Sequence, residues 1–199
     1  MKAALILAGG KAVRLHGEGK ASVMLRGKPL LQWVIESIAP CVDALYLSGN
    51  DDLSEFGYPV IRDELLHRGP LSGFHAAFSR IDAEYTFVAG CDMPFINPEV
   101  VQYLFEKATG YSCCLPRENQ YTEPLCCVYR SADVRTCIPS VIKKGDKRIW
   151  NLIEYLPNPR YIPFEEIKRI DPHLLSFRNI NTLTDLEYAE TLIDEGERK

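Results

Sequence analysis

A glycine pair followed by basic residues is the part of the chain best suited to chemistry. The apolar run at residues 2–8 leads into Gly9 and Gly10, and Arg14 and Lys20 follow. Glycines have no Cβ, so their backbone N–H groups can approach phosphate oxygens closely. Fixed cations favour a ligand with several negative charges, so the stretch predicts a nucleoside triphosphate site. No G-x-G-x-x-G or G-x-x-x-x-G-K-[ST] pattern follows this strand, which disfavours a Rossmann oxidoreductase.

A carboxylate follows a second expected strand. Residues 85–89 are mostly apolar, and Asp92 stands shortly after them. Ligands of open α/β sheets bind outside the carboxyl ends of the strands, so we expect Asp92 and the glycine loop to share a crevice. Asp92 would bind Mg²⁺ there, because Mg²⁺ takes one or two carboxylates with phosphate oxygens and water. From position alone, capping of the turn before Met93 is an equally good interpretation.

Other polar residues stand near the expected ends of strands. Asn50 follows one short apolar strand and Asp63 follows another. Asp63 could accept paired hydrogen bonds from the N1–H and amino group of guanine, whereas a solvent-exposed loop carboxylate is the alternative. Asn179 and Asn181 would face the same way in an extended segment and could complete a Mg²⁺ site. Helix capping is the alternative for Asn181.

Two further motifs have both a structural and a chemical interpretation. The loop that ends at Gly73 leads into an expected helix N-terminus, where N–H groups suit an anion or the polar edge of a base. A tight turn explains this motif equally well. Arg148 ends a basic stretch that is either a surface turn or a clamp for an anionic second substrate. The four histidines do not cluster in the sequence, so a catalytic histidine is unsupported.

The order of the elements predicts an α/β fold: a three-layer sandwich with a mostly parallel central sheet flanked by helices. Strands are expected at residues 2–8, 44–48, 59–61, 85–89, 111–115, 125–129 and 161–164. Helices are expected from Pro29 to Pro40 and at residues 71–80, 98–107, 131–143, 148–156 and 184–195. Asn97 is the expected N-cap of the third helix, and the polar residues 116–124 are expected to form a substrate loop. The 199 residues predict one domain that spans residues 1–199.

Composition narrows the classes of function. The net charge of −4 argues against a nucleic-acid-binding surface. No segment is long enough to span a membrane, and the first apolar run is too short for a signal peptide, so a cytoplasmic protein is expected. The seven cysteines include the adjacent pairs Cys113–Cys114 and Cys126–Cys127, whose side chains would point to opposite faces of a strand. They are expected to be small buried residues in a reducing compartment rather than zinc ligands.

Taken in order, these segments resemble the molybdenum cofactor guanylyltransferases, a family of the nucleotidyltransferase superfamily with a Rossmann-like sheet. The resemblance covers the whole chain. It rests on Leu7-Ala8-Gly9-Gly10, Arg14, Gly17, Lys20, Gly27-Lys28-Pro29-Leu30, Gly69-Pro70-Leu71-Ser72-Gly73, Cys91-Asp92-Met93-Pro94-Phe95 and Asn179-Ile180-Asn181-Thr182. The opening pattern and the proline after the aspartate are shared by the superfamily, whereas the Gly-Pro-Leu-x-Gly and Asn-x-Asn-Thr blocks favour this family.

The resemblance implies Mg²⁺-dependent transfer of GMP from GTP to the terminal phosphate of Mo-molybdopterin, with release of pyrophosphate. The residues that would line the GTP site are Leu7, Ala8, Gly9, Gly10 and Gly73. Lys20 would hold phosphates, Asn50 and Asp63 would lie near the guanosine, and Asp92 would bind Mg²⁺ and GTP. The positions otherwise associated with activity are Arg14, Arg148, Asn179 and Asn181. Implied partners are GTP, Mo-molybdopterin, other molybdenum cofactor biosynthesis proteins and apo-molybdoenzymes, with neither nucleic acid nor a membrane among them.

One departure from the family pattern lies in the basic loop. The family usually has Arg-Met-Gly-x-x-Asp-Lys, whereas His16 and Gly19 here replace a glycine and the aspartate. The missing carboxylate removes a partner for Lys20 or Arg14 and leaves the turnover rate and the choice of nucleotide open. Alternative functions are transfer from CTP, transfer to another phosphorylated acceptor such as a sugar phosphate, and nucleotide binding with weakened turnover.

Overall fold

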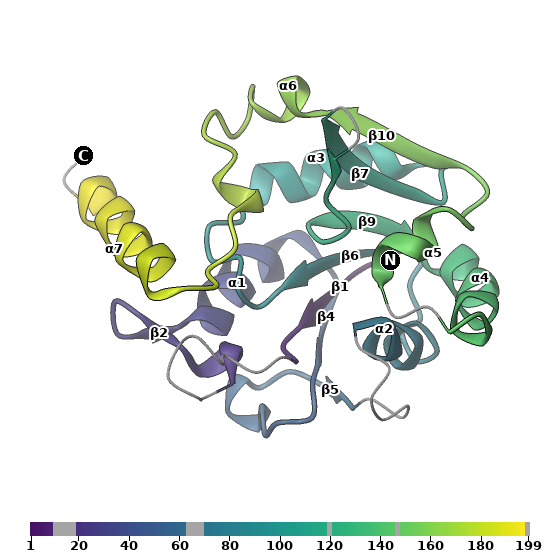
Figure 1. The fold of residues 1–199 in the computed structure, drawn as a ribbon, viewed down its shortest axis with the longest axis horizontal. Coiled ribbons are helices and arrows are strands. Elements are labelled where there is room, and N and C mark those ends of the chain that lie inside the picture. Colours follow the sequence, from purple (N-terminus) through teal and green to yellow (C-terminus); the bar gives the residue numbers. More distant parts are fainter. Residues whose placement is uncertain (10–18, 63–69, 119–120, 146–147, 198–199) are drawn as a thin grey trace.

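The computed structural model describes residues 1–9, 19–62, 70–118, 121–145 and 148–197. An eight-stranded sheet lies at the centre (Figure 1), with seven strands in the order β10-β7-β9-β6-β1-β4-β5 and β8 paired with β7. Its strands are β1 (Lys2–Leu7), β4 (Ala44–Ser48), β5 (Val60–Ile61), β6 (Tyr85–Gly90), β7 (Cys113–Glu118), β8 (Tyr121–Thr122), β9 (Cys127–Arg130) and β10 (Pro159–Pro163). A separate two-stranded ribbon joins β2 (Met24–Leu25) to β3 (Lys28–Pro29).

Helices and short 3₁₀ turns connect these strands. The α-helices are α1 (Leu30–Ile38), α2 (Pro70–Phe78), α3 (Pro98–Ala108), α4 (Ser131–Lys143), α5 (Ile149–Ile153), α6 (Phe164–Ile167) and α7 (Leu183–Glu197). The 3₁₀ turns are η1 (Lys20–Ser22), η2 (Ala39–Cys41), η3 (Ser54–Phe56) and η4 (Leu175–Phe177). Within the described ranges, no helix combines the length and the apolar character needed to cross a membrane.

The directions of the strands bring several carboxyl ends to one edge of the sheet. β1 pairs in parallel with β4 and β6, β4 with β5, and β7 with β10. β9 is antiparallel to both β6 and β7, so β6 and β7 run in the same direction. The carboxyl ends of β1, β4, β6, β7 and β10 therefore lie at the same edge. The mostly parallel sheet flanked by helices confirms the predicted fold class.

Helices cover both faces of the sheet (Figure 1). α1 and α3 pack on one face together with Ala4 and Ile6 of β1, whereas α2, α4 and α5 pack on the other face with Ala3 and Leu5. Successive residues of β1 thus enter opposite cores, as the period of two in a strand requires.

The adjacent cysteines follow the same alternation. Cys114 and Cys126 lie in the core with α1 and α3, and Cys113 and Cys127 lie in the core with α2, α4 and α5. All seven cysteines are free thiols, and these four and Cys91 are buried. The interpretation of the adjacent pairs as small buried residues on opposite faces is confirmed.

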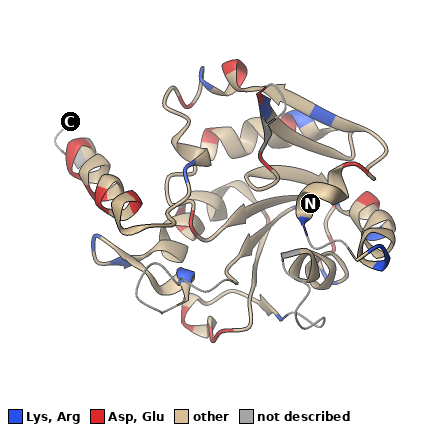
Figure 2. Ribbon diagram, in the orientation of Figure 1, with Lys and Arg blue, Asp and Glu red and all other residues tan. Residues whose placement is uncertain are grey.

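A third, smaller core holds the C-terminal segment against the β2–β3 ribbon. Its buried members are Val23, Leu25, Leu30, Ile180 and Ala189. An ion pair between Arg26 and Asp194 adds a polar contact between the ribbon and α7. Acidic residues stand along α7, which lies to one side of the sheet (Figure 2). This core matters for function because it connects two segments that reach the edge of the sheet.

Several predicted elements begin or end elsewhere. Pro29 precedes α1 instead of opening it, because Lys28–Pro29 pairs with β2. β9 starts at Cys127 because Cys126 has a φ of 60°, in the left-handed region that interrupts a strand. β7 starts at Cys113, since Tyr111 N still bonds to Ala108 O in the turn after α3. Residues 116–124 are not wholly a loop, because they include the end of β7 and all of β8.

Candidate active site

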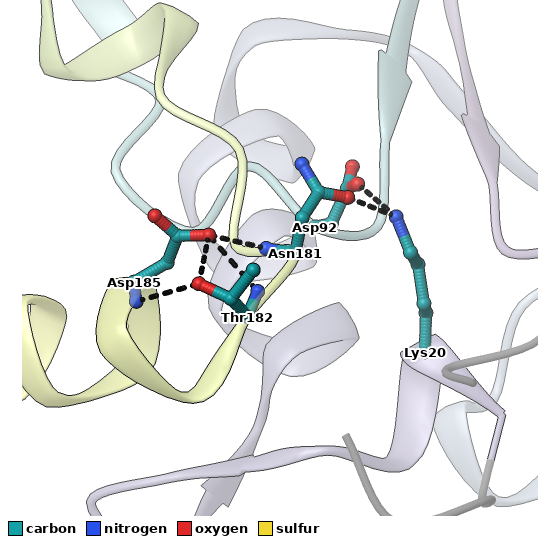
Figure 3. Close-up of polar contacts among 5 residues, drawn as sticks. All are labelled: Lys20, Asp92, Asn181, Thr182 and Asp185. Carbon is teal, nitrogen blue, oxygen red and sulfur yellow. Dashed lines mark hydrogen bonds and ion pairs between the residues drawn. The ribbon is translucent and has the colours of Figure 1, made fainter. Parts of the chain in front are cut away.

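An ammonium group and two side-chain oxygens meet at the carboxyl edge of the sheet (Figure 3). Lys20 Nζ lies 2.7 Å from Asp92 Oδ2 and donates a second hydrogen bond of 2.6 Å to Asn181 Oδ1. The side chains of Lys20 and Asp92 are 23% and 13% exposed, so solvent and salt screen this pair less than a surface ion pair. Three segments that are far apart in the sequence thus converge on one polar point.

Asp92 is held by the end of β6 and by the neighbouring strand β1. Cys91 N donates a 3.0 Å hydrogen bond to Leu7 O at the carboxyl end of β1. The Asp92 carboxylate folds back over Gly90, where a Cβ would lie 2.4 Å from Oδ1. Only glycine leaves room for this conformation. Burial, reinforced by the Asp92 carboxylate, raises the pKa of the Cys91 thiol to about 12.

Asn181 reaches Lys20 because its segment docks against Asp92. Ile180 N donates a 2.8 Å hydrogen bond to Asp92 O, and the Ile180 side chain is buried in the third core. Asp185 Oδ2 accepts hydrogen bonds from the backbone N–H groups of Asn181 and Thr182 and from the Thr182 hydroxyl, as Figure 3 shows. These bonds, that of the Thr182 hydroxyl most of all, lower the pKa of the Asp185 carboxyl. In return Asp185 N donates to Thr182 Oγ1, so the start of α7 is capped from both sides.

Lys20 is positioned by the same core that holds Ile180. It is the first residue of η1, and Val23 and Leu25, which follow closely, are buried in the third core. The lysine and the asparagine that accepts its hydrogen bond are therefore anchored at two neighbouring points of one apolar cluster. This arrangement limits how far the Lys20 ammonium and the Asn181 side-chain amide can move apart.

The described part of the glycine loop lies beside this cluster. Leu7 pairs with Gly90 in the sheet, so Gly9 and Asp92 each stand two residues beyond a paired position. Ala8 N donates a 2.7 Å hydrogen bond to Ser48 O at the end of β4. Gly9 is exposed, and no atom of the described residues lies within 4 Å of where its Cβ would be. Of these three residues Gly9 is therefore the accessible one, whereas Leu7 is half-buried and Ala8 is buried.

Three other predicted site residues take no part in the contacts that join Lys20, Asp92 and Asn181. Asn50 is exposed after β4, Gly73 is buried in the first turn of α2, and Arg148 is the exposed N-cap residue of α5. Three further predicted residues lie outside the described residues, namely Gly10, Arg14 and Asp63.

Oxygen atoms of Asp92 and of the segment docked against it suit a hard divalent cation. Asn179 precedes the docked Ile180, and its Oδ1 is enclosed without a hydrogen-bond partner in the described structure. Such an orphaned acceptor costs free energy unless water or a cation satisfies it. Carboxylate and amide oxygens are ligands that Mg²⁺ accepts, so Asp92, Asn179 and Asn181 fit this ion. No group of three or more His, Cys, Asp or Glu side chains gathers in the described ranges, so phosphate oxygens and water would complete the ligand set.

Two residues near the site, Gly90 and Asp51, are not among those predicted from the sequence. Gly90 leaves room for the observed conformation of Asp92. The sequence signal for this role is the position of Gly90, two residues before the carboxylate. Asp51 lies beside Gly19, where a Cβ would be 3.0 Å from Asp51 Oδ2. A carboxylate thus lies next to the position at which the family pattern has an aspartate. No sequence signal links residues 19 and 51, because their proximity depends on the fold.

Comparisons with known proteins identify the family of the chain. Residues 4–160 match the MobA-like NTP transferase domain. A Methanosarcina mazei protein named "Probable molybdenum cofactor guanylyltransferase" is 34% identical over 199 residues, which cover 94% of this chain and 88% of that protein. A Desulfosudis oleivorans protein named "Molybdenum cofactor guanylyltransferase" is 30% identical over 201 residues, 96% of each chain.

A solved structure shows the same likeness. The molybdopterin-guanine dinucleotide biosynthesis protein A from Archaeoglobus fulgidus is 34% identical and superposes with a TM-score of 0.81. The superposition covers 98% of this chain and 100% of that chain. The chain therefore belongs to the MobA-like NTP transferase family and is a nucleotidyltransferase.

Proposed function

We propose that the protein transfers GMP from GTP to the terminal phosphate of Mo-molybdopterin, in a Mg²⁺-dependent reaction that gives Mo-molybdopterin guanine dinucleotide and pyrophosphate. The observation that carries this proposal is the meeting of Lys20, Asp92 and Asn181 beside the Gly9 loop. An ammonium group and oxygen ligands at one point suit a triphosphate with its metal. The names of the relatives support GTP and molybdopterin as the substrates.

Lys20 supplies positive charge and a hydrogen-bond donor to the phosphates. An ammonium group has three N–H donors, and Asp92 and Asn181 use two of them. The third can bond to a phosphate oxygen without loss of the other two. Because both partners hold Lys20 Nζ before the substrate arrives, little reorganisation is needed when charge develops in the transition state.

Asp92, with the amide oxygens of Asn179 and Asn181, would hold Mg²⁺. Bound there, Mg²⁺ would neutralise charge on the triphosphate. The acceptor phosphate is already ionised at pH 7, so one of its oxygens can attack the α-phosphorus of GTP without a general base. A new P–O bond forms while the α–β P–O bond breaks, and the bonding electron pair leaves with pyrophosphate. Lys20 acts here by orienting phosphates and offsetting their charge.

The test is pyrophosphate release from each of the four nucleoside triphosphates, with Mg²⁺ and with or without Mo-molybdopterin. We expect release from GTP when the acceptor is present. Asp92→Asn should lower the rate at least about 100-fold, because one electrostatic group in an active site contributes about 10²–10³. Glu36→Gln is the matched control. Glu36 also pairs with a lysine, Lys28 at 2.6 Å, but with side chains one-third to one-half exposed, so we expect a change of less than about twofold.

Four outcomes would contradict parts of the proposal separately. Release from CTP in place of GTP would refute the nucleotide, and release with a sugar phosphate in place of Mo-molybdopterin would refute the acceptor. Unchanged turnover in Asp92→Asn would refute the site. Tight GTP binding without release of pyrophosphate would indicate a nucleotide-binding relative with weakened turnover.

We also propose the cytoplasm as the place of this reaction. The seven free thiols suit a reducing compartment. One sheet contains both β1 near the start of the chain and β10 near its end, which supports a single nucleotidyltransferase domain over residues 1–199. Other molybdenum cofactor biosynthesis proteins and apo-molybdoenzymes are the protein partners that this function calls for.

A further inference from the structure

An open hollow of about 470 Å³ lies beside the ends of β7 and β10. Its lining residues are Arg117, Glu118, Tyr161, Pro163 and Glu165. In the order of the sheet, β7 is two strands from β6 and β10 is three strands away. At the usual strand spacing, the hollow is about 10–14 Å along the sheet from the end of β6. Because these strands run in the same direction, it lies at the same edge as Asp92.

The hollow contains a planar aromatic surface. The Tyr161 residue is 39% exposed, which is unusual for a large apolar group among the described residues. The Arg117 guanidinium carbon lies 4.5 Å from the centroid of its ring. Guanidinium and aromatic planes both stack on flat heteroaromatic rings. The pair therefore offers a flat ligand a face on which to stack.

Two carboxylates, those of Glu118 and Glu165, line the same hollow. A carboxylate can accept two parallel hydrogen bonds from a ring N–H and an adjacent amino group. The 2-amino-4-oxo edge of a pterin presents this donor pair, as guanine does. Glu165 Oε1 also lies 3.8 Å from Lys168 Nζ, in a pair whose side chains are 68% and 44% exposed. Such exposed pairs are weak, so a ligand can replace Lys168 as the partner of Glu165. The aromatic face and the two carboxylates suit the ring end of an acceptor.

A chain of contacts within the protein joins the wall of the hollow to the neighbourhood of Asp92. Glu123 N donates a 3.4 Å hydrogen bond to Pro116 O, next to Arg117 in β7. Leu125 N then bonds to Glu123 Oε1 at 3.0 Å. Leu125 Cδ1 lies 3.5 Å from where a Cβ on Gly90 would be, beside the Asp92 carboxylate. Glu123 is only 7% exposed, so these contacts lie largely below the surface. They fix the hollow and the Asp92 site relative to one another, at a separation that one extended ligand can span.

We propose that the hollow binds the pterin ring of the acceptor, and this inference rests on the proposed function for the acceptor's identity. Tyr161 and Arg117 stack on the ring, and Glu118 and Glu165 accept hydrogen bonds from its amino-pyrimidinone edge. The phosphate arm then extends along the same edge of the sheet towards Asp92 and Lys20. These residues thereby select a pterin-bearing acceptor over a simple sugar phosphate.

The experiment is a fluorescence titration with two free ring compounds, pterin and lumazine, which carries an oxo group in place of the 2-amino group. Saturating GTP and Mg²⁺ are present throughout, because pterin shares its polar edge with guanine and could enter the guanosine site. Wild-type protein should bind pterin about tenfold more tightly than lumazine, since loss of one donor leaves a carboxylate unpaired. Tyr161→Ala should weaken binding of both compounds about tenfold, and Tyr161→Phe should keep it. The double variant Glu118→Gln/Glu165→Gln should lose the preference for pterin and still bind lumazine.

Several results would overturn the inference. The inference fails if Tyr161→Ala binds pterin as the wild-type protein does, or if pterin competes with GTP. It also fails if the wild-type protein does not bind pterin at concentrations up to about 1 mM, which corresponds to only about 4 kcal/mol of binding free energy. Thermal shift with GTP keeps the two proposals apart. If GTP fails to stabilise the wild-type protein while pterin binding still depends on Tyr161, the proposed function fails and the hollow remains a pterin site.

Discussion

Replacing Gly90 with alanine would place a methyl carbon 2.4 Å from Asp92 Oδ1. Ordinary contact begins near 3.4 Å, so the carboxylate would have to move by about 1 Å, and a displacement of that size at a reacting centre costs about 100-fold in rate. That factor corresponds to about 2.7 kcal/mol of transition-state stabilisation. The next two atoms, Leu125 Cδ1 at 3.5 Å and Asp92 Cγ at 3.6 Å, would be in normal packing contact. The conflict is therefore with Asp92 itself.

The assay for Gly90→Ala is pyrophosphate release with GTP, Mg²⁺ and Mo-molybdopterin, together with a melting curve. We expect kcat to fall about 100-fold because the carboxylate is displaced by about 1 Å, and we expect the fold to be retained. Gly196→Ala is the matched control, because a Cβ at Gly196 of α7 would meet no atom within 4 Å. Its rate should equal that of the wild-type protein.

A double-mutant cycle tests whether Gly90 acts through Asp92. In an Asp92→Ala background the carboxylate is gone, so Gly90→Ala should have little further effect on the rate. Wild-type turnover in Gly90→Ala would show that the conformation of Asp92 does not depend on Gly90. Full additivity of the two substitutions would show that the methyl group acts on something other than the carboxylate.

Three further predictions concern the surroundings of the site. Gly19→Asp should set a second carboxylate beside Asp51 and lower the free energy of unfolding by about 0.2–1 kcal/mol at low salt. The loss should disappear in an Asp51→Asn background, and a loss that persists there would contradict the contact between residues 19 and 51. Asp185→Asn should cost about 1 kcal/mol in urea unfolding at neutral pH by weakening the cap of α7. Because the pKa of Asp185 is lowered in the fold, this difference should shrink as the pH falls through that pKa, and a difference that grows in acid would count against it. The pKa of the Cys91 thiol is raised to about 12 in the fold, so the stability that the neutral thiol contributes is complete below about pH 9. This stability is lost as the pH rises towards 12, by up to about 1.4 kcal/mol per pH unit. Cys91→Ala should flatten that part of the pH profile in urea unfolding, and an unchanged slope would refute this prediction.

The meeting of Lys20 and Asp92 could be predicted from the sequence. Apolar runs mark buried strands, and the carboxyl ends of parallel strands share an edge. The residues that follow β1 and β6 were therefore expected to lie together, and the two side chains are 2.7 Å apart. The adjacent cysteines could be assigned to opposite cores in the same way, because side chains alternate along a strand.

The contact between Lys20 and Asn181 could not be predicted. The two residues are 161 positions apart in the sequence, and their meeting depends on how Ile180 enters a core with Val23 and Leu25. The sequence offered Asn181 only as a metal ligand or a helix cap. It also gave no sign that Cys126 would adopt a positive φ and delay β9, because that conformation is imposed by the surrounding structure and not by the residue type.

The most direct measurement is a crystal structure with GTP and Mn²⁺ in place of Mg²⁺, in which anomalous scattering locates the ion. We expect Mn²⁺ bound by the Asp92 carboxylate and by the triphosphate, with Lys20 Nζ in contact with a phosphate oxygen. A triphosphate bound away from the Gly9 loop, or Mn²⁺ with no contact to Asp92, would contradict this expectation.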